Sequence, residues 1–232
     1  MSAENNVCCH KDNLPTNKLK ILAIHGYRQN AEVFKNKTGS FRKMLHKWAQ
    51  FTYITAPHKV LVVENDDTEI GQAKDLEQYG WFFNREDNSF RGIRKGGPAI
   101  GYEESIKLIE KVVETDGPFD GIFGFSQGAC FVGLLCDLQH RGMLPFKFNF
   151  AIMSSGFKSG SLPHMKYYSD TIAIPSLHIY GTADKIIPTE MSSDLASCFD
   201  NPMVVTHPGG HYLPATATQK HDFQAFIKNL RR

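Results

Sequence analysis

The chain has 232 residues, of which 41% are hydrophobic, and its formal net charge is +2 at pH 7. This length allows one large or two small domains, and the apolar fraction suffices for a sizeable core. The small net charge, with both signs interspersed, argues against a nucleic-acid-binding protein. No apolar run approaches the roughly 20 residues of a membrane span, so a membrane-spanning protein is disfavoured too.

The predicted elements alternate between strands and helices along the chain. Apolar runs of buried-strand length predict strands at 20–24, 51–55, 121–125, 148–154, 176–180 and 203–206. Apolar residues at helical spacing predict a helix that begins near residue 40, helices at 102–114, 129–141 and 189–199, and a last helix that ends near Leu230. This alternation predicts an α/β fold, a mostly parallel sheet of about six strands with helices on both faces. We expect it to form one domain over residues 19–232.

The amino terminus and the cysteines indicate the compartment. The first residues lack the basic start and the apolar core of a signal peptide. Five cysteines, an odd number without framework spacing, favour a reducing compartment. We therefore expect the cytoplasm, with the nucleus as an alternative. Residues 1–18 carry no recognisable motif, and we expect a disordered tail there, although Cys8 and Cys9 could be lipidated or bind a metal.

A long insertion interrupts the alternation at residues 57–98. Loops longer than about 12–15 residues are uncommon in compact domains and are usually functional or disordered. This one carries Trp81 and Phe82 amid polar sequence, and a second insertion at 157–171 begins with Phe157. These rings either pack against the sheet or line a pocket for an apolar group of a ligand, and both interpretations stay open here.

The pentapeptide Gly-Phe-Ser-Gln-Gly at 124–128 lies between the predicted strand at 121–125 and the predicted helix at 129–141. A Gly-x-Ser-x-Gly between strand and helix is the nucleophile-elbow pattern. The serine needs a sharp turn that lifts its hydroxyl above the sheet, and the glycines leave room for that turn. The pattern therefore predicts that Ser126 is a nucleophile.

A serine hydroxyl needs a base, and the base needs an acid that orients it. In the fold that contains this elbow, the acid and then the base follow the serine along the chain. Asp184 and His211 occur in that order, each just after a predicted strand. Asp184 could instead be an ordinary turn residue, and His207 competes as the base. We favour His211 because Pro208 restricts the backbone at His207.

Donors for the oxyanion should come from the backbone beside the nucleophile and from the loop after an early strand. The first is the amide of Gln127. The predicted strand at 20–24 runs into His25 and Gly26, which leaves the Tyr27 amide as the second candidate. The alternative is that His25 and Gly26 only form a turn.

Five motifs together resemble the FSH family of serine hydrolases, and within it the ovarian-cancer-associated esterase branch of eukaryotes: residues 24–30, 124–128, 155–157, 181–184 and 209–211. The resemblance covers roughly residues 19–230. It implies an α/β-hydrolase with carboxylesterase activity, with Ser126 as nucleophile, Asp184 as acid and His211 as base. It also implies an oxyanion site at residues 25–27 and Gln127, and a leaning towards esters of long acyl chains.

The sequence therefore predicts a serine esterase that acts on a small-molecule ester through an acyl-enzyme. We expect no cofactor and no metal, because the ten histidines show no paired ligand spacing. Thioesters and activated amides are alternative substrates of the same three residues. A non-catalytic binding protein on a hydrolase fold is the non-enzymatic alternative. Nothing in the sequence indicates the oligomeric state.

Overall fold

A six-stranded parallel sheet forms the centre of the computed structural model, which describes residues 18–61 and 77–230. The strand order is β2-β1-β5-β6-β7-β8, and every neighbouring pair is parallel. The strands are β1 (Leu19–Ile24), β2 (Ala49–Ile54), β5 (Gly121–Phe125), β6 (Phe150–Ser154), β7 (Ser176–Gly181) and β8 (Met203–His207). The predicted α/β class and the predicted number of strands are confirmed.

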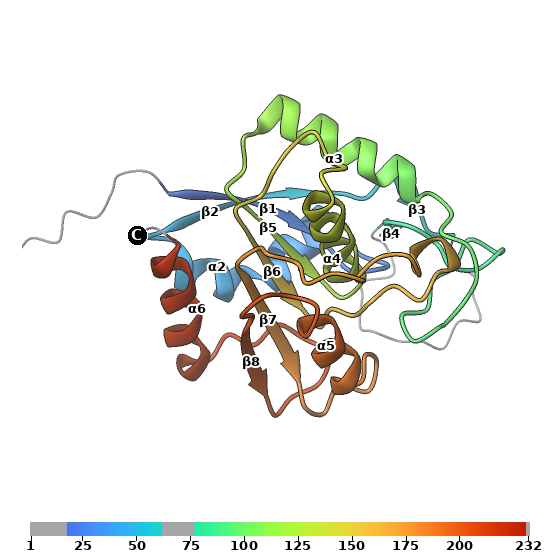
Figure 1. The fold of residues 1–232 in the computed structure, drawn as a ribbon. Helices are drawn as coiled ribbons and strands as arrows, with labels where there is room; N and C mark the ends of the chain where they lie inside the picture. The colour runs from blue at the N-terminus through green and yellow to red at the C-terminus, as the bar shows by residue number, and fades with distance from the viewer. Residues whose placement is uncertain (1–17, 62–76, 231–232) are drawn as a thin grey trace, which may run out of the picture.

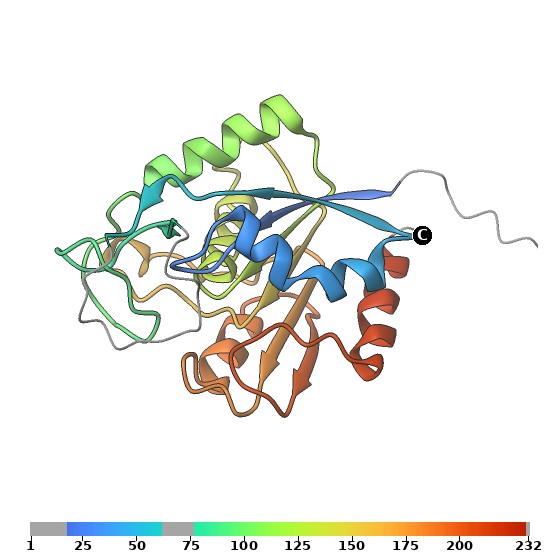
Figure 2. The same cartoon turned by 180° about the vertical axis from the view of Figure 1, so that it is seen from behind.

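Helices cover both faces of this sheet. One face carries α3 (Tyr102–Asp116), α4 (Gln127–His140) and α5 (Thr189–Ala196). In Figure 1, α4 and α5 lie in front of the sheet and α3 runs along the top of the molecule. The other face carries α1 (Ala31–Lys37), α2 (Gly39–Leu45) and α6 (Ala217–Asn229), seen from their own side in Figure 2. None of the helices in the described ranges combines the length and the apolar composition that crossing a membrane requires.

Alternate residues of one strand belong to two different cores. In β1, Ile21 and Ala23 pack with residues of α1, α2 and α6, whereas Leu22 and Ile24 pack with residues of α3 and α4. All four side chains are fully buried. Successive side chains of a strand point to opposite faces, so a strand covered on both faces is apolar throughout. This explains why the strands appear in the sequence as continuous apolar runs.

The described part of the long insertion packs onto the face that α3 and α4 cover. It contributes a short antiparallel pair, β3 (His58–Lys59) with β4 (Tyr79–Gly80). Immediately after β4, the ring of Trp81 stacks on Phe131 of α4 with ring centroids 5.3 Å apart. Phe82 lies in the same core cluster. Of the two interpretations of these rings, the structure shows packing against the sheet and its helices.

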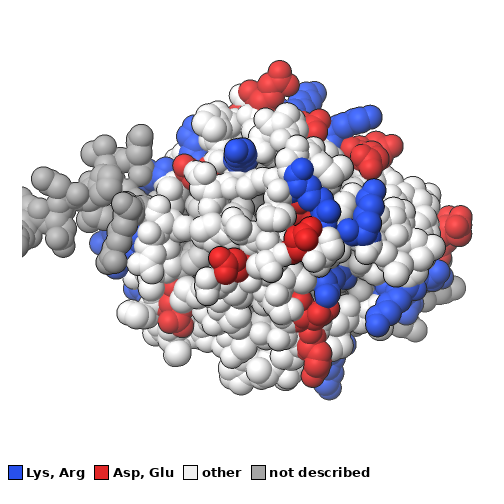
Figure 3. Space-filling view, viewed as in Figure 1, with Lys and Arg blue, Asp and Glu red and all other residues white. Residues whose placement is uncertain are grey.

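Some expectations fall outside the described ranges. The expected disordered tail at residues 1–18 lies outside them except for Lys18. Cys8 and Cys9, considered as lipidation or metal sites, also lie outside them. The second insertion is described and contains one turn of 3-10 helix, η1 (Leu162–His164). On the face seen in Figure 3, positive and negative side chains lie near one another among uncharged residues.

Candidate active site

Ser126 occupies the turn between β5 and α4. Its backbone angles are φ 53° and ψ −116°, a positive φ that residues with a side chain rarely adopt. The turn is possible because of the glycines on either side. A Cβ on Gly124 would lie 2.5 Å from the carbonyl oxygen of Gly128, and a Cβ on Gly128 would lie 2.5 Å from the carbonyl oxygen of His25. The predicted elbow is therefore formed, and it presents Ser126 at the carboxyl edge of the sheet.

His211 contacts both Ser126 and Asp184. Its Nε2 atom lies 2.9 Å from Ser126 Oγ, and its Nδ1 atom lies 2.7 Å from Asp184 Oδ2. A carboxylate only accepts hydrogen bonds, so Nδ1 carries the proton and Nε2 is left to accept the proton of the serine hydroxyl. Three side chains that are distant in the sequence thus form one hydrogen-bonded chain.

Asp184 is held by its own turn. Its Oδ1 accepts hydrogen bonds from the backbone amides of Ile186 and Ile187, at 2.8 and 2.9 Å, which leaves Oδ2 for His211. Burial raises the pKa of this carboxyl, but the hydrogen bonds from His211 and the Ile187 amide outweigh burial and leave the pKa below its ordinary value. Asp184 therefore stays ionised near neutral pH and remains an acceptor for the Nδ1 proton of His211.

The loop that carries His211 rests on the end of β7. The amides of Thr182 and Ala183 donate to the carbonyls of His207 and Gly209, at 2.8 and 3.1 Å. Gly181 makes this approach possible, because a Cβ there would lie 2.1 Å from the Gly209 carbonyl oxygen. His207, the competing base, is turned to this loop, where its Nδ1 accepts from the Gly209 amide at 3.2 Å. The structure thus brings His211, and not His207, to Ser126.

The two segments expected to form the oxyanion site also meet beside the nucleophile. Gln127 is the first residue of α4, where backbone amides lack partners within the helix. Gly26 lies against the elbow, since a Cβ there would be 3.3 Å from Ser126 Cβ. Tyr27 follows directly and is partly buried, its ring 5.6 Å from that of Phe90. The role of the Tyr27 and Gln127 amides as donors stays a prediction.

The aromatic residues predicted to bind substrate are buried. Trp81 and Phe82 are 0% exposed and Phe157 is 1% exposed. All three rings lie in the core that also contains residues of α3 and α4. None of the three therefore presents surface to a ligand. Their part in substrate binding stays a prediction, and the burial of these side chains does not support it.

Exposed apolar side chains occur on the segments next to triad residues, and they could not be recognised as exposed from the sequence. Ile186 is 46% exposed, Tyr212 is 51% exposed and Ile93 is 59% exposed. Ile186 lies two residues after Asp184, and Tyr212 directly follows His211. Ile93 follows Gly92, where a Cβ would lie 2.6 Å from Ile187 Cδ1. The signal that could have found the first two is their position beside triad residues in the chain.

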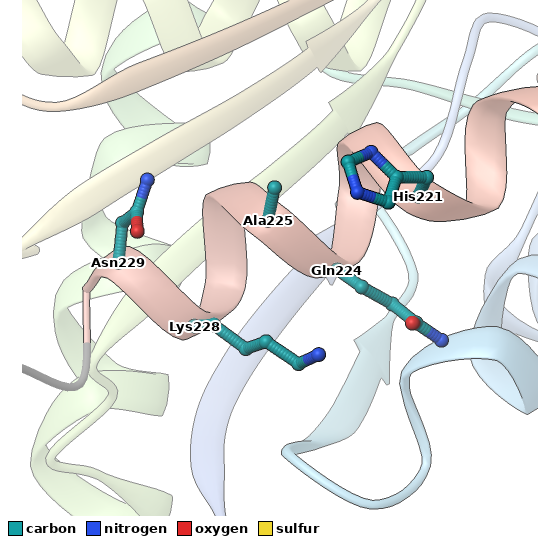
Figure 4. Close-up of a pocket in the computed structure, with 5 residues that line it drawn as sticks. All are labelled: His221, Gln224, Ala225, Lys228 and Asn229. Atoms are coloured by element: carbon teal, nitrogen blue, oxygen red, sulfur yellow. The ribbon is translucent and has the colours of Figure 1, made fainter.

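Two hollows on the surface lie away from the triad. One of about 210 Å³ is on the outer side of α6, lined by His221, Gln224, Ala225, Lys228 and Asn229 (Figure 4). A second, of about 220 Å³, lies between α2 and α6. Neither includes a triad residue. Within the ranges that the structure describes, no three His, Cys, Asp or Glu side chains gather as metal ligands would.

We predict that Gly181→Ala displaces the His211 loop, because the new Cβ would overlap the Gly209 carbonyl. A displacement of about 1 Å in a reacting group can cost about 10²-fold in rate. Hydrolysis of p-nitrophenyl acetate by the purified variant should fall by at least that factor. Gly39→Ala is the matched control, since a Cβ there meets no described atom within 4 Å. Equal rates for the two variants would contradict this account of the loop.

Comparisons with known proteins identify the family of this chain. The family model "Serine hydrolase (FSH1)" matches residues 15–223. An esterase of Aedes aegypti is 54% identical over 214 residues, which cover 92% of this chain and 77% of the relative. The esterase OVCA2 of Danio rerio is 41% identical over 222 residues, covering 92% and 98% respectively.

Solved structures of lower identity share the fold. SOBER1 of Arabidopsis thaliana aligns with a TM-score of 0.62 at 16% identity, over 93% of this chain and all of that one. Acyl-protein thioesterase 2 of Zea mays aligns with a TM-score of 0.62 at 19% identity, over 93% and 95%. The predicted α/β-hydrolase fold is confirmed. A family match that spans nearly the whole chain, with relatives this similar, shows that the chain belongs to the FSH1 family of serine hydrolases.

Proposed function

We propose that this serine hydrolase is a carboxylesterase that works through an acyl-enzyme, with Ser126 as nucleophile, His211 as base and Asp184 as acid. The observation that carries the proposal is the chain of hydrogen bonds from Ser126 Oγ through His211 to Asp184, at 2.9 and 2.7 Å. The non-catalytic alternative would require a missing or separated triad member, and all three are in contact.

In the first half of the reaction, His211 Nε2 takes the proton of Ser126 as Oγ attacks the ester carbonyl carbon. The carbonyl oxygen becomes an oxyanion that accepts hydrogen bonds from the amides of Tyr27 and Gln127, and each such donor contributes about 2.7–4 kcal/mol in the transition state. Asp184 stabilises the imidazolium that has formed. His211 then gives its proton to the departing alcohol oxygen, and an ester between Ser126 and the acyl group remains.

In the second half, His211 removes a proton from water, whose oxygen attacks the acyl carbon. The carboxylic acid leaves as Ser126 Oγ regains a proton from His211. A thioester or an activated amide would follow the same steps with a different leaving group, so they remain alternative substrates. We also propose a reducing compartment such as the cytoplasm, supported by the free thiols of the described cysteines, Cys130, Cys136 and Cys198.

The acyl preference that we propose is for long chains. The support is the apolar rim, defined as Ile93, Ile186 and Tyr212, whose side chains are about half exposed. Ile186 and Tyr212 are sequence neighbours of Asp184 and His211, and Ile93 follows Gly92, which lies against Ile187. An acyl chain laid across these side chains would remove apolar surface from water, at about 25 cal/mol per Å². Phe157, which is buried beside Gly92, would support this surface rather than touch the acyl chain.

We predict that Ser126→Ala folds normally and loses ester hydrolysis by about six orders of magnitude, as triad nucleophiles do elsewhere. Turnover of p-nitrophenyl butyrate by wild type and variant, with circular dichroism of both, measures this. A variant that retains more than a trace of turnover in a clean preparation would end the proposal.

We predict that Ile186→Asn lowers kcat/KM for a long-chain ester about five- to tenfold more than for an acetate ester, because part of the apolar contact with the chain is lost. A series of p-nitrophenyl esters that differ only in acyl length measures this. Met143→Asn is the control, since Met143 is 58% exposed beyond the other end of α4. Parallel losses at all acyl lengths would reject the rim as the acyl site.

A further inference from the structure

Trp81 is bonded to both segments that carry the proposed oxyanion donors. Its indole Nε1–H donates to the carbonyl oxygen of His25 at 2.8 Å. Its backbone amide donates to Gln127 Oε1 at 2.9 Å, and Gln127 Nε2 donates back to the Phe82 carbonyl at 2.7 Å. Trp81 and Gln127 are both fully buried, so water does not compete for these hydrogen bonds. One residue of the long insertion therefore links the loop after β1 to the first residue of α4.

The loop after β1 is held from within by His25. The Ala56 amide donates to His25 Nε2 at 3.0 Å, so the ring proton is on Nδ1, which donates to the Gly26 carbonyl at 2.7 Å. Burial lowers the pKa of His25 to about 4, which keeps this arrangement intact near neutral pH. Gln29 holds the other side of Gly26, because its Oε1 accepts from the Gly26 amide at 3.2 Å.

These contacts set the direction of the Tyr27 amide. In a trans peptide, the carbonyl of one residue and the amide of the next point in opposite directions. The Gly26–Tyr27 bond is trans, and the Gly26 carbonyl is turned towards the His25 ring. The Tyr27 N–H lies in the same peptide plane and therefore points away from the His25 ring. His25 orients this donor, and the indole of Trp81 holds the carbonyl of the same His25.

Trp81 itself is immobilised on several sides. Its ring stacks on Phe131 and lies 5.3 Å from the His25 ring, centroid to centroid. Its carbonyl accepts a hydrogen bond from the buried hydroxyl of Ser105 on α3. The Gly128 backbone also lies against the His25 carbonyl. The separation between His25 and the start of α4 is thus determined by a rigid side chain rather than by loop backbone alone.

We infer that Trp81 is a positioning residue for the oxyanion site, which holds the 25–27 loop and Gln127 so that the Tyr27 and Gln127 amides converge on one oxygen. The inference rests on the proposed function and differs from the substrate-binding role that the sequence suggested for Trp81. A donor that stabilises an oxyanion acts in the transition state and not on bound ester. Removing the hydrogen bonds of Trp81 to these segments should therefore lower kcat and leave KM nearly unchanged.

The test is Trp81→Phe, which keeps an aromatic ring and the backbone amide but deletes the indole N–H. Removing one oxyanion donor outright costs about 10²–10³ in kcat, so misplacing one should cost about 10- to 100-fold. We expect that fall in kcat for p-nitrophenyl acetate, with KM within about twofold of wild type. Trp48→Phe is the matched control, because Trp48 is the other of the two tryptophans and lies beneath Lys228 of α6.

The inhibition constant of an aryl boronic acid distinguishes a positioning role of Trp81 from a merely structural one, which would leave this constant unchanged. The adduct of the boronic acid with Ser126 is tetrahedral and places an oxygen where the oxyanion forms. We expect its inhibition constant to rise in Trp81→Phe by about the factor lost in kcat, and to be unchanged in Trp48→Phe. The kcat of each variant is expressed per active site, and the active sites are counted by titration with a fluorophosphonate.

Three outcomes would overturn the inference. In the first, Trp81→Phe keeps the wild-type kcat and the wild-type inhibition constant for the boronic acid. In the second, kcat per titrated site is unchanged while fewer sites titrate. In the third, only KM for long-chain esters rises. If Trp81→Phe does not fold, Gln127→Met decides by the same criteria, since it keeps the Gln127 amide and removes both side-chain hydrogen bonds. A wild-type protein without esterase activity would instead refute the proposed function.

Discussion

Backbone segments approach one another at the carboxyl edge of the sheet to distances that a side chain would prevent. Gly124 and Gly128 let β5 turn sharply into α4, and Gly181 lets the loop with His211 rest on the end of β7. These contacts bring Ser126, Asp184 and His211 within hydrogen-bond distance although each follows a different strand. The chemistry proposed for this family member depends on that close approach, because proton transfer needs heavy atoms about 3 Å apart.

Around this edge, three layers serve different purposes. The sheet and its helices bring the triad together, and they provide the buried contacts that hold the folded chain. The long insertion adds a second layer, in which Trp81 lies between His25 and Gln127 and connects the segments that face the nucleophile. The outermost layer is the apolar rim, whose exposed side chains form the proposed acyl site. Rate and acyl preference should therefore be separable by mutation.

Much of the fold and the triad could be predicted from the sequence, because both depend on local patterns. Apolar runs mark the strands, and the elbow motif marks Ser126. Asp184 and His211 each follow a predicted strand, and a parallel sheet brings the ends of its strands to one edge. The place of Trp81 could not be predicted. Its partners, Phe131 and Gln127, lie about fifty residues away along the chain, and an aromatic ring in a loop has the same sequence signature whether it packs inward or lines a pocket. Exposure of the rim depends in the same way on how distant loops meet.

The most direct test of the central claim is the rate at which a fluorophosphonate modifies Ser126, followed by peptide mass spectrometry in wild type and in Asp184→Asn. An asparagine can still accept from the amides of Ile186 and Ile187, but its NH₂ group would donate to His211 Nδ1 and move the ring proton to Nε2. The account predicts an adduct on Ser126 that forms about 10⁴-fold more slowly in the variant, as the wrong tautomer causes in such triads. An adduct on another residue, or equal rates for both proteins, would contradict it.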